Sequence, residues 1–393
     1  MRRTEVLEGL RVLKFRSVLD CWESAELSQL EAAELLGVGE RTFRRWCGRY
    51  RAGGDAGLLD RRLGQEADNR VPAAEAARVE ALYRERYAGF TAKHFHEHLM
   101  REHGFGWGYT WTKVFLQSRG LLKPAPRRGI HRRKRPRRPL PGMMLHQDAS
   151  RHEWVAAQPA CDLVVTLDDA TSAIYSAILV SEEGTASTFA GLLEVFTAHG
   201  LPCCLYTDRG SHYFHTPEVG GKVSKGVRTQ VGRALAQLGI EHIAAYSPEA
   251  RGRSERAFRT LQDRLPKDLA LAGITTIEAA NAYLRQTYVR EHNARFAVAA
   301  EQVGTAFVAV PGIDLAEVLC HQEQRQVGND NTVVLQRVRL QIPASPLRAH
   351  YVRAMVQVRR YLDGSHAVFH GPRCIGRYDA VGGCLDVCAQ QAA

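Results

Sequence analysis

The sequence predicts a multidomain α/β protein, with helical domains at the N-terminus, an α/β domain in the centre and a small β-rich domain at the C-terminus. A chain of 393 residues is long enough for roughly two to four domains. Apolar residues follow a helical period in the first third, and strand-like runs alternate with helical ones after residue 142. The expected segments are a helix-turn-helix domain at 1–62, a second helical (helix-turn-helix-like) domain at 63–122, a basic linker at 123–141, the α/β domain at 142–300, an irregular linker at 301–328 and a small β-barrel or sheet at 329–393.

Positive charge is concentrated in the first third of the chain. Residues 1–140 hold 29 Lys and Arg against 17 Asp and Glu, whereas residues 141–393 hold 24 against 25. This distribution favours a polyanionic partner for the N-terminal part. A solvated basic face is the alternative.

The nine cysteines favour reduced thiols in a cytosolic protein, because they are scattered, odd in number and form no CxxC pair. The N-terminus is charged throughout, unlike a signal peptide. No apolar run is long enough to span a bilayer. We therefore expect a cytoplasmic protein without a membrane partner.

The segment at 29–50, QLEAAELLGVGERTFRRWCGRY, predicts a helix-turn-helix. Gly37 interrupts two helical runs, of which the second is basic. A small core is expected from Ala32, Leu35, Leu36, Val38, Phe43 and Trp46. The second helix is expected to enter a DNA major groove with Arg41, Thr42, Arg44 and Arg45. An ordinary helical hairpin is the alternative.

A similar unit is expected between residues 72 and 121. Pro72 suits the start of a helix, and glycines separate two further helices at 90–104 and 109–121. The last of these carries Thr112 and Lys113 and is a second candidate recognition helix.

Four histidines lie on the expected helix at 90–104: His94, His96, His98 and His103. His94 and His98 would share a helix face, but no cysteine or carboxylate set completes a metal site. A partly exposed helix face is therefore the preferred interpretation, ahead of a metal centre.

The segment KPAPRRGIHRRKRPRR at 123–138 holds nine Lys or Arg and is interrupted by prolines. Such a segment cannot bury a core and predicts an extended linker. Its charge suits sequence-independent contact with a phosphate backbone, through residues that include Arg132, Arg133, Lys134 and Arg135. A solvated spacer is the alternative.

From residue 143 the pattern of apolar residues changes, and strand-like runs alternate with helical ones. Strands are expected at 143–155, 161–180, 202–208 and 242–246, and helices at 185–199, about 229–238, from Ser254 onwards and at 276–292. This order suits antiparallel strands that lead into parallel ones. Residues 293–328 are expected to be irregular. Alternation then predicts strands at 331–342, 353–362 and 366–370, with a hairpin turn at Asp363-Gly364.

Three acidic residues stand where expected strands and helices begin or end. Asp148 lies on the first strand, Asp208 closes the strand CCLYTD, and Glu255 opens a helix. Carboxylates in such places can converge and bind two Mg²⁺ or Mn²⁺ ions, which prefer oxygen ligands. A two-metal site stabilises the attacking and leaving oxygens of an in-line phosphoryl displacement.

The motifs HQDAS, TDRG and SPEARGRSERAFRTLQDRL together resemble the signatures of DDE transposases in the retroviral-integrase superfamily. The closest resemblance is to bacterial insertion-sequence transposases of the ISNCY type, and it covers nearly the whole chain. It implies an RNase-H-like integrase catalytic core at 142–300 that uses magnesium. Carried over by motif, the catalytic and metal-binding triad is Asp148, Asp208 and Glu255.

The resemblance also implies a function and partners. The N-terminal helices would bind the terminal inverted repeats of an insertion sequence, and the core would cleave there and join the 3′-hydroxyl ends to target DNA. A homo-oligomer is expected because two ends must be paired, and the protein would associate with the bacterial nucleoid. An inactive, transposase-derived DNA-binding regulator and an RNase-H-like nuclease without joining activity are the alternatives.

Two features depart from the superfamily's pattern. Asp208 and Glu255 are separated by 46 residues, more than is usual there, and the excess is expected in a loop at 215–228, where added length costs little. The zinc-binding His/His/Cys/Cys module of retroviral integrases is absent from the N-terminal segment.

Other acids compete for two of the three positions. Asp168 and Asp169 compete with Asp148 but are expected in a hairpin turn. Glu249 competes with Glu255 but precedes the expected helix. On that helix, Phe258, Leu261 and Leu265 would pack inward, and Glu255 would project beside them.

Several neighbours are expected to assist. His146, Gln147 and Arg209 would orient a carboxylate or contact the scissile phosphate, or equally would be structural. The arginines of the third motif are expected to approach DNA phosphates: Arg251, Arg253, Arg256, Arg259 and Arg264.

Overall fold

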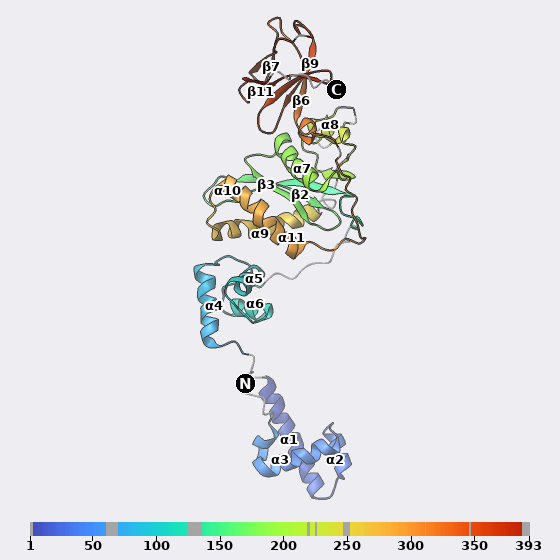
Figure 1. The fold of residues 1–393 in the computed structure, drawn as a ribbon. Helices are drawn as coiled ribbons and strands as arrows, with labels where there is room; N and C mark the ends of the chain where they lie inside the picture. The colour runs from blue at the N-terminus through green and yellow to red at the C-terminus, as the bar shows by residue number, and fades with distance from the viewer. Residues whose placement is uncertain are drawn as a thin grey trace. The chain divides into compact units, whose positions relative to one another are not determined.

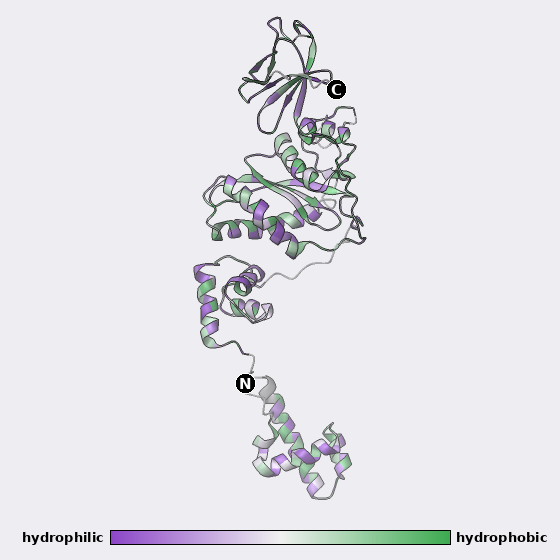
Figure 2. Cartoon of the chain, in the orientation of Figure 1, coloured by the Kyte–Doolittle hydropathy of each residue, from purple (hydrophilic) through white to green (hydrophobic). Residues whose placement is uncertain are grey.

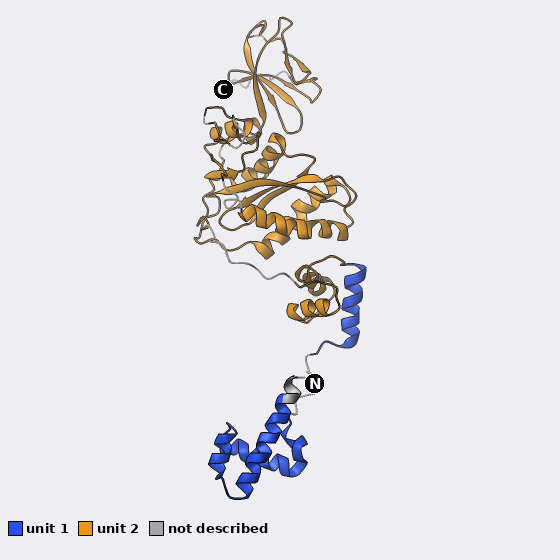
Figure 3. Ribbon diagram, turned by 180° about the vertical axis from the view of Figure 1, so that it is seen from behind, with its two compact units in different colours: residues 1–86 blue, residues 87–393 orange. Residues whose placement is uncertain are grey.

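The structure is a computed structural model that describes residues 3–59, 70–124, 136–217, 221–224, 226–246, 252–310, 312–345 and 347–386. The chain forms two compact units, Met1–Arg86 and Tyr87–Ala393 (Figure 3). The division falls inside the segment expected to be the second helical domain. None of the helices in the described ranges has the length and apolarity needed to cross a bilayer.

The first unit contains the predicted helix-turn-helix. Its helices are α1 (Arg3–Glu23), α2 (Gln29–Leu35), α3 (Glu40–Leu58) and α4 (Ala73–Glu85). Ser28 and Glu31 form a capping box at the start of α2, since each side chain accepts a hydrogen bond from the other residue's backbone N–H. Gly37, at φ 68°, makes the turn between α2 and α3.

Aromatic and small side chains close the core of this unit. Phe15 and Phe43 are buried, with ring centroids 6.1 Å apart, and Ala32 packs beside them. The prediction that Leu35 joins this core is wrong, because its side chain is 51% exposed. The neighbouring Ala33 is buried instead, so the inward face of α2 is lined by small residues that let α1 and α3 approach it.

The second unit begins with α5 (Ala92–Glu102) and α6 (Tyr109–Ser118). These helices match the predicted pair, and the glycine-containing segment between them turns at Gly104, at φ 63°. His96 and Thr112 hydrogen-bond across the pair at 3.0 Å.

A five-stranded sheet forms the centre of the second unit, in the order β3-β2-β1-β4-β5. Its strands β2 and β3 are labelled in Figure 1. The strands of the sheet are β1 (Leu145–His152), β2 (Cys161–Asp168), β3 (Ile174–Val180), β4 (Cys204–Thr207) and β5 (Glu241–Ala244). The first three are antiparallel neighbours, and β4 and β5 pair in parallel with β1 and with each other. This is the topology of the RNase-H-like fold, as expected.

Helices cover both faces of the sheet, and the strands β2 and β3 are largely hydrophobic (Figure 2). The helices are α7 (Thr185–His199), α8 (Gln230–Gln237), α9 (Gly252–Leu271), α10 (Ile277–Tyr283), the π-helical turn η2 (Leu284–Tyr288) and α11 (Val289–Phe296). One core lies between the sheet and α9, with Leu163, Val165 and Leu261. A second lies between the sheet, α7 and α8, with Leu145 and Leu205.

The C-terminal part is β-rich, as predicted. After α12 (Leu315–Val318) come β6 (His321–Gln326), β7 (Thr332–Leu335), β8 (Val338–Gln341), β9 (Met355–Arg360), β10 (His366–His370), β11 (Arg373–Tyr378) and β12 (Cys384–Asp386). Five of them form a sheet in the order β12-β11-β10-β9-β6, and β7 pairs with β8. The predicted hairpin turn is present, with Gly364 at φ 86°.

Two expectations for this part are wrong. Strand β6 lies within the segment expected to be irregular, because its polar residues carry no alternating pattern. The run at 331–342 is two strands rather than one. Gln336 and Arg337, both at positive φ, form a tight turn between them that no Gly or Asn announces.

Leu261→Ala should lower the free energy of unfolding by about 2–5 kcal/mol, because it leaves a cavity where a fully buried side chain packs between α9 and the sheet. Chemical denaturation followed by circular dichroism measures the change. Thr260→Ala, one residue away and partly exposed, is the matched control and should change stability by less than about 0.5 kcal/mol. Equal losses in both variants would contradict this core.

Candidate active site

Asp148 lies on β1 and faces the side of the sheet that α9 covers. It pairs with Val165 of β2, which belongs to the core beneath α9, and paired residues on antiparallel strands share a face. Ser150, two residues further on, accepts a hydrogen bond from Gln262 of α9 at 2.9 Å. Asp148 is therefore directed toward α9.

Asp208 follows β4 directly, on the same side of the sheet. Leu145 and His146 of β1 pair with Leu205 and Tyr206 of β4, and the same offset, continued by two residues, brings Asp148 level with Asp208. The rings of His146 and Tyr206 lie 5.1 Å apart, which shows that these alternate positions share a face. The Asp208 carboxylate accepts the backbone N–H of Gly210 at 2.8 Å.

Glu255 lies in the first turn of α9 and is exposed. The buried side chains of Phe258, Leu261, Leu265 and Leu269 hold the helix on the sheet. Arg253 contacts Asp169, next to His146, and Gln262 contacts Ser150. Glu255 lies between these two contacts along α9, so its backbone is held near β1, the strand that carries Asp148.

The three carboxylates thus lie in one region of the fold, but their oxygen atoms are not all close enough to one another to bind a single ion. Within the described ranges, the group of three side chains whose ligand atoms all lie within 4.8 Å of one another is His94, His98 and Asp268.

The competing acid Asp169 is occupied by internal contacts. It is buried, accepts hydrogen bonds from His146 Nε2 at 2.7 Å and from the Arg138 backbone N–H at 2.8 Å, and pairs with Arg253. Burial alone would raise the pKa of its carboxyl, but these hydrogen bonds and the nearby positive charges outweigh burial and lower the pKa. Asp169 is therefore an anchor for the start of α9.

The other competitor, Asp168, closes the turn between β2 and β3. Its fully buried carboxylate accepts the backbone N–H of Gly142 at 3.0 Å and both the N–H and the hydroxyl of Thr171 at 2.8 Å. The sequence placed both acids in a hairpin turn, and the structure agrees, since Asp168 ends β2 and Asp169 lies in the turn that leads to β3. Glu249 lies outside the described residues.

The three expected assistants lie in different surroundings. His146 contacts Asp169. Gln147 points to the opposite face, where its amide donates to Thr166 and its oxygen accepts from the Tyr213 hydroxyl. Arg209 donates to the Gly221 carbonyl at 2.8 Å and lies over the Tyr246 ring. Of the three, Gln147 is a structural residue, because the sheet separates it from Asp148.

The residues expected to contact DNA also lie in different surroundings. Arg41, Arg44 and Arg45 are exposed on α3 and Thr42 is half-buried; Lys113, Arg256 and Arg259 are exposed as well. Arg132, Arg133, Lys134, Arg135 and Arg251 lie outside the described residues.

For three residues, burial shows that the expected contact with DNA is wrong. Thr112 is 0% exposed and bonded to His96, so it cannot reach DNA. Arg253 is directed inward to Asp169. Arg264 is buried and pairs with Glu97 at 2.6 Å. A helical period alone did not separate these inward positions from the exposed ones.

The expectation that the histidines form a partly exposed helix face is also wrong. His94, His96 and His98 are buried, and Asp268 of α9 supplies the carboxylate that the local sequence lacked. A signal was present, since Asp268 stands three residues after Leu265, at an inward-facing helical position. A charged residue at such a position needs a buried partner.

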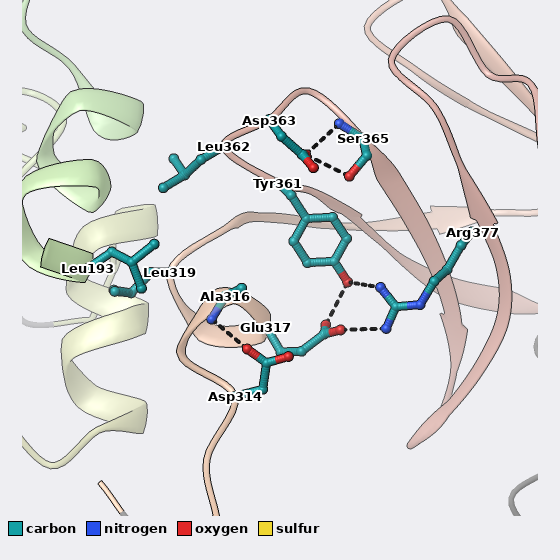
Figure 4. Close-up of a pocket in the computed structure, with 10 residues that line it drawn as sticks. All are labelled: Leu193, Asp314, Ala316, Glu317, Leu319, Tyr361, Leu362, Asp363, Ser365 and Arg377. Carbon is teal, nitrogen blue, oxygen red and sulfur yellow. Dashed lines mark hydrogen bonds and ion pairs between the residues drawn. The ribbon is translucent and has the colours of Figure 1, made fainter. Parts of the chain in front are cut away.

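A cavity of about 330 Å³ lies elsewhere, where α7 and α12 meet the turn between β9 and β10 and the strand β11 (Figure 4). In it, Glu317 accepts a hydrogen bond from the Tyr361 hydroxyl at 2.7 Å and pairs with Arg377 at 2.8 Å. Because these charged groups neutralise one another, we interpret the cavity as part of a packing interface. It lies away from the start of α9.

Comparison with known sequences gives three findings. A family model described as a helix-turn-helix domain matches residues 16–65. The chain is 32% identical over 342 residues to the putative transposase y4bF of Sinorhizobium fredii, which covers 86% of this chain and 74% of that protein. It is 33% identical over 162 residues to the transposase for insertion sequence IS1202 of Streptococcus pneumoniae, covering 41% of this chain and 34% of that protein.

Solved structures of retroviral integrases resemble parts of the chain. The HTLV-2 integrase catalytic core domain in complex with magnesium is 18% identical, covers 38% of this chain and 90% of its own, and has a TM-score of 0.29. The simian T-cell lymphotropic virus intasome in complex with PP2A regulatory subunit B56 gamma is 16% identical, covers 67% and 85%, and has a TM-score of 0.33.

Asp169→Asn should destabilise the protein by about 3–5 kcal/mol at neutral pH, because Arg253 and His146 lose a buried anion. Since the pKa of Asp169 is lowered in the folded state, its stabilisation is present above the unfolded value of about 4 and is lost as pH falls further. Unfolding free energies of wild type and variant, measured against pH, should therefore begin to converge as the pH falls below about 4 and should meet only where the carboxyl of the folded protein is itself protonated.

The control for this prediction is Asp263→Asn, which removes the partly exposed pair with Lys267 and should cost less than about 1 kcal/mol. A difference between wild type and Asp169→Asn that did not depend on pH would contradict the role of the carboxylate charge.

Proposed function

The chain belongs to the bacterial transposase family, and we propose that it cleaves DNA at the ends of an insertion sequence and joins the 3′-hydroxyl ends to target DNA. Its function lies in DNA transposition; the two reaction steps and the site are the proposal. The observation that carries it is the placement of Asp148, Asp208 and Glu255. Two strands in parallel register and the helix that covers them bring three acids to one region of an RNase-H-like sheet.

The three acids fit a divalent cation that prefers oxygen ligands. Asp148, Asp208 and Glu255 offer carboxylate oxygens only, the donor type that suits Mg²⁺ or Mn²⁺. Such ions, two in the proposal, stabilise charge on the attacking and leaving oxygens of phosphoryl transfer. The competing acid Asp169 already pairs with Arg253. Its carboxylate is therefore not available to bind a metal ion as the three proposed ligands are.

The exposed arginines of α9 have a complementary role in this proposal. Arg256 and Arg259 lie on the outer side of the helix that carries Glu255. They attract DNA phosphates to a region that carboxylates would otherwise repel. Their contribution is electrostatic and independent of base sequence, so it should weaken with salt.

Recognition of the DNA ends is assigned to the first unit. The helix-turn-helix match includes the whole of α2 and α3. Arg41, Arg44 and Arg45 are exposed on the first turns of α3, the part of a recognition helix that reaches base edges. Since the two ends of an element must be brought together, we propose that the protein acts as a homo-oligomer.

Asp208→Asn and Glu255→Gln should each reduce both cleavage and joining at least about 1,000-fold, because each removes a charge that the reaction depends on. The assay uses the purified full chain, Mg²⁺ and a duplex with the inverted repeats that flank its gene. Affinity for that duplex, measured in parallel, should be unchanged.

Glu241→Gln is the matched control, since Glu241 is an exposed acid on the neighbouring strand β5, and it should retain activity. The products also separate the alternatives. Nicks without joined strands indicate a nuclease, and bound but uncut DNA indicates a regulator. Full strand transfer by the Asp208 or Glu255 variant would overturn the proposed triad.

Arg44→Ala and Arg45→Ala should each weaken binding to the inverted repeat by about 1–3 kcal/mol if they read base edges, with a smaller effect on unrelated DNA. Arg51→Ala on the same helix is the control, because Arg51 pairs with Glu23 and lies over Trp22. Fluorescence anisotropy at fixed salt measures all three. Losses equal to that of Arg51→Ala would contradict the role of α3.

A further inference from the structure

Two histidines and an aspartate form a buried cluster between α5 and α9, outside the acidic triad. His94 Nε2 lies 2.9 Å from Asp268 Oδ1, His98 Nε2 lies 3.2 Å from the same oxygen, and the two Nε2 atoms are 3.2 Å apart. All three side chains are buried. Three ligand-type atoms from two helices thus face one common point.

The size of this triangle matches a four-coordinate transition-metal site. Ligand atoms about 2.0–2.1 Å from a tetrahedral Zn²⁺ lie about 3.3 Å from one another. The edges of 2.9–3.2 Å are shorter by a few tenths of an ångström, so a small outward movement of the side chains accommodates an ion. His94 and His98, one helical turn apart on α5, form the spacing that places two imidazoles on one metal.

The surroundings of His98 fix which of its nitrogens faces the cluster. Its Nδ1 lies 2.7 Å from Glu102 Oε1, and Glu102 also accepts a hydrogen bond from the Tyr87 hydroxyl at 3.0 Å. A carboxylate that holds the distal N–H of a histidine is the usual outer partner of a metal ligand, because it orients the ring and sets the tautomer. With a proton on Nδ1, His98 would present the Nε2 lone pair to Asp268 and His94.

The close approach of these three atoms needs a positive charge among them. The two Nε2 atoms lie 3.2 Å apart and both face Asp268 Oδ1. Lone pairs at such distances repel one another unless a proton or a cation lies between them. Imidazole nitrogens and carboxylate oxygens are atoms that bind transition metals.

We propose that His94, His98 and Asp268 bind one divalent transition-metal ion of the zinc class, which fastens α5 to α9. The ligands are two imidazole nitrogens and a carboxylate that can offer one or both oxygens, a set that selects Zn²⁺ over Mg²⁺. Further contacts already join the same helices, including Arg264 with Glu97 and Thr91 with Asp263.

The site would act on the position of α9. Asp268 and Glu255 lie on this one helix, so an ion at Asp268 limits how far the helix can shift along the sheet. Its role is structural and separate from the chemistry proposed for the acidic triad. The metal site is therefore tested independently of the proposed transposition steps.

The test is the metal content of the purified full chain. After dialysis, elemental analysis should find one zinc per chain, and Co²⁺ added to chelator-treated protein should give the intense visible absorption of a four-coordinate site. His98→Gln and Asp268→Asn should lose this metal. Glu102→Gln should keep the ligands but bind Zn²⁺ about 10–100-fold more weakly, because Glu102 only orients His98.

Two controls keep the result specific. His96→Gln alters a buried histidine of the same helix that bonds Thr112 instead of the cluster and should retain the zinc. Asp208→Asn should retain it too, which separates this site from the triad. Retention of zinc by the His98 and Asp268 variants would place the metal elsewhere and overturn the proposal.

A measurement on wild type alone covers the case in which a variant does not fold. The thermal unfolding midpoint of chelator-treated wild-type protein should rise when ZnCl₂ is added and should not rise with MgCl₂, because an ion that binds the folded state stabilises it. An unchanged midpoint with ZnCl₂, together with no Co²⁺ absorption, would show that the cluster is held by a proton and would overturn the proposal.

Discussion

The parallel pairing of β1 with β4 is the constraint on which the proposed active site depends. Leu145 and Leu205 are paired and buried on the α7 side of the sheet, and this apolar requirement fixes the register. Because side chains alternate along a strand, a slip of one residue would turn Asp148 away from α9. The packing of a hydrophobic core thereby determines where two acidic residues stand, and the same alternation sends Gln147 to the opposite face.

The third acid is placed by helix packing. The apolar face of α9 rests on β1 and β2, and polar contacts at three points along the helix oppose its sliding. Arg253 pairs with Asp169 near its start, Gln262 bonds to Ser150 in its middle, and Asp268 meets the histidines of α5 near its end. Of two adjacent acids in the β2–β3 turn, Asp168 closes the turn and Asp169 holds the helix. Asp169, which competes with Asp148 in the sequence, thus helps to position the helix that carries Glu255.

Most of the secondary structure could be predicted from sequence because periodicity and turn residues are local signals. The strands of the central sheet, the helix-turn-helix and the Asp363-Gly364 turn all follow from them, and the family resemblance supplied the RNase-H-like topology. What could not be predicted depends on contacts between distant residues. Thr112 looked like a DNA contact until its bond to His96 became visible, and the histidines lacked a ligand because Asp268 lies 170 residues further on. Arg253 and Arg264 resemble Arg256 in sequence, but only the fold shows which arginines are paired inside.

Anomalous diffraction from crystals of the full chain grown with MnCl₂ would locate the bound metal ions directly. Manganese is suited to this measurement because it takes the same oxygen ligands as Mg²⁺. The proposed active site predicts anomalous peaks bounded by the carboxylates of Asp148, Asp208 and Glu255. Peaks at Asp168 or Asp169, or a Glu255 side chain directed away from bound manganese, would contradict it.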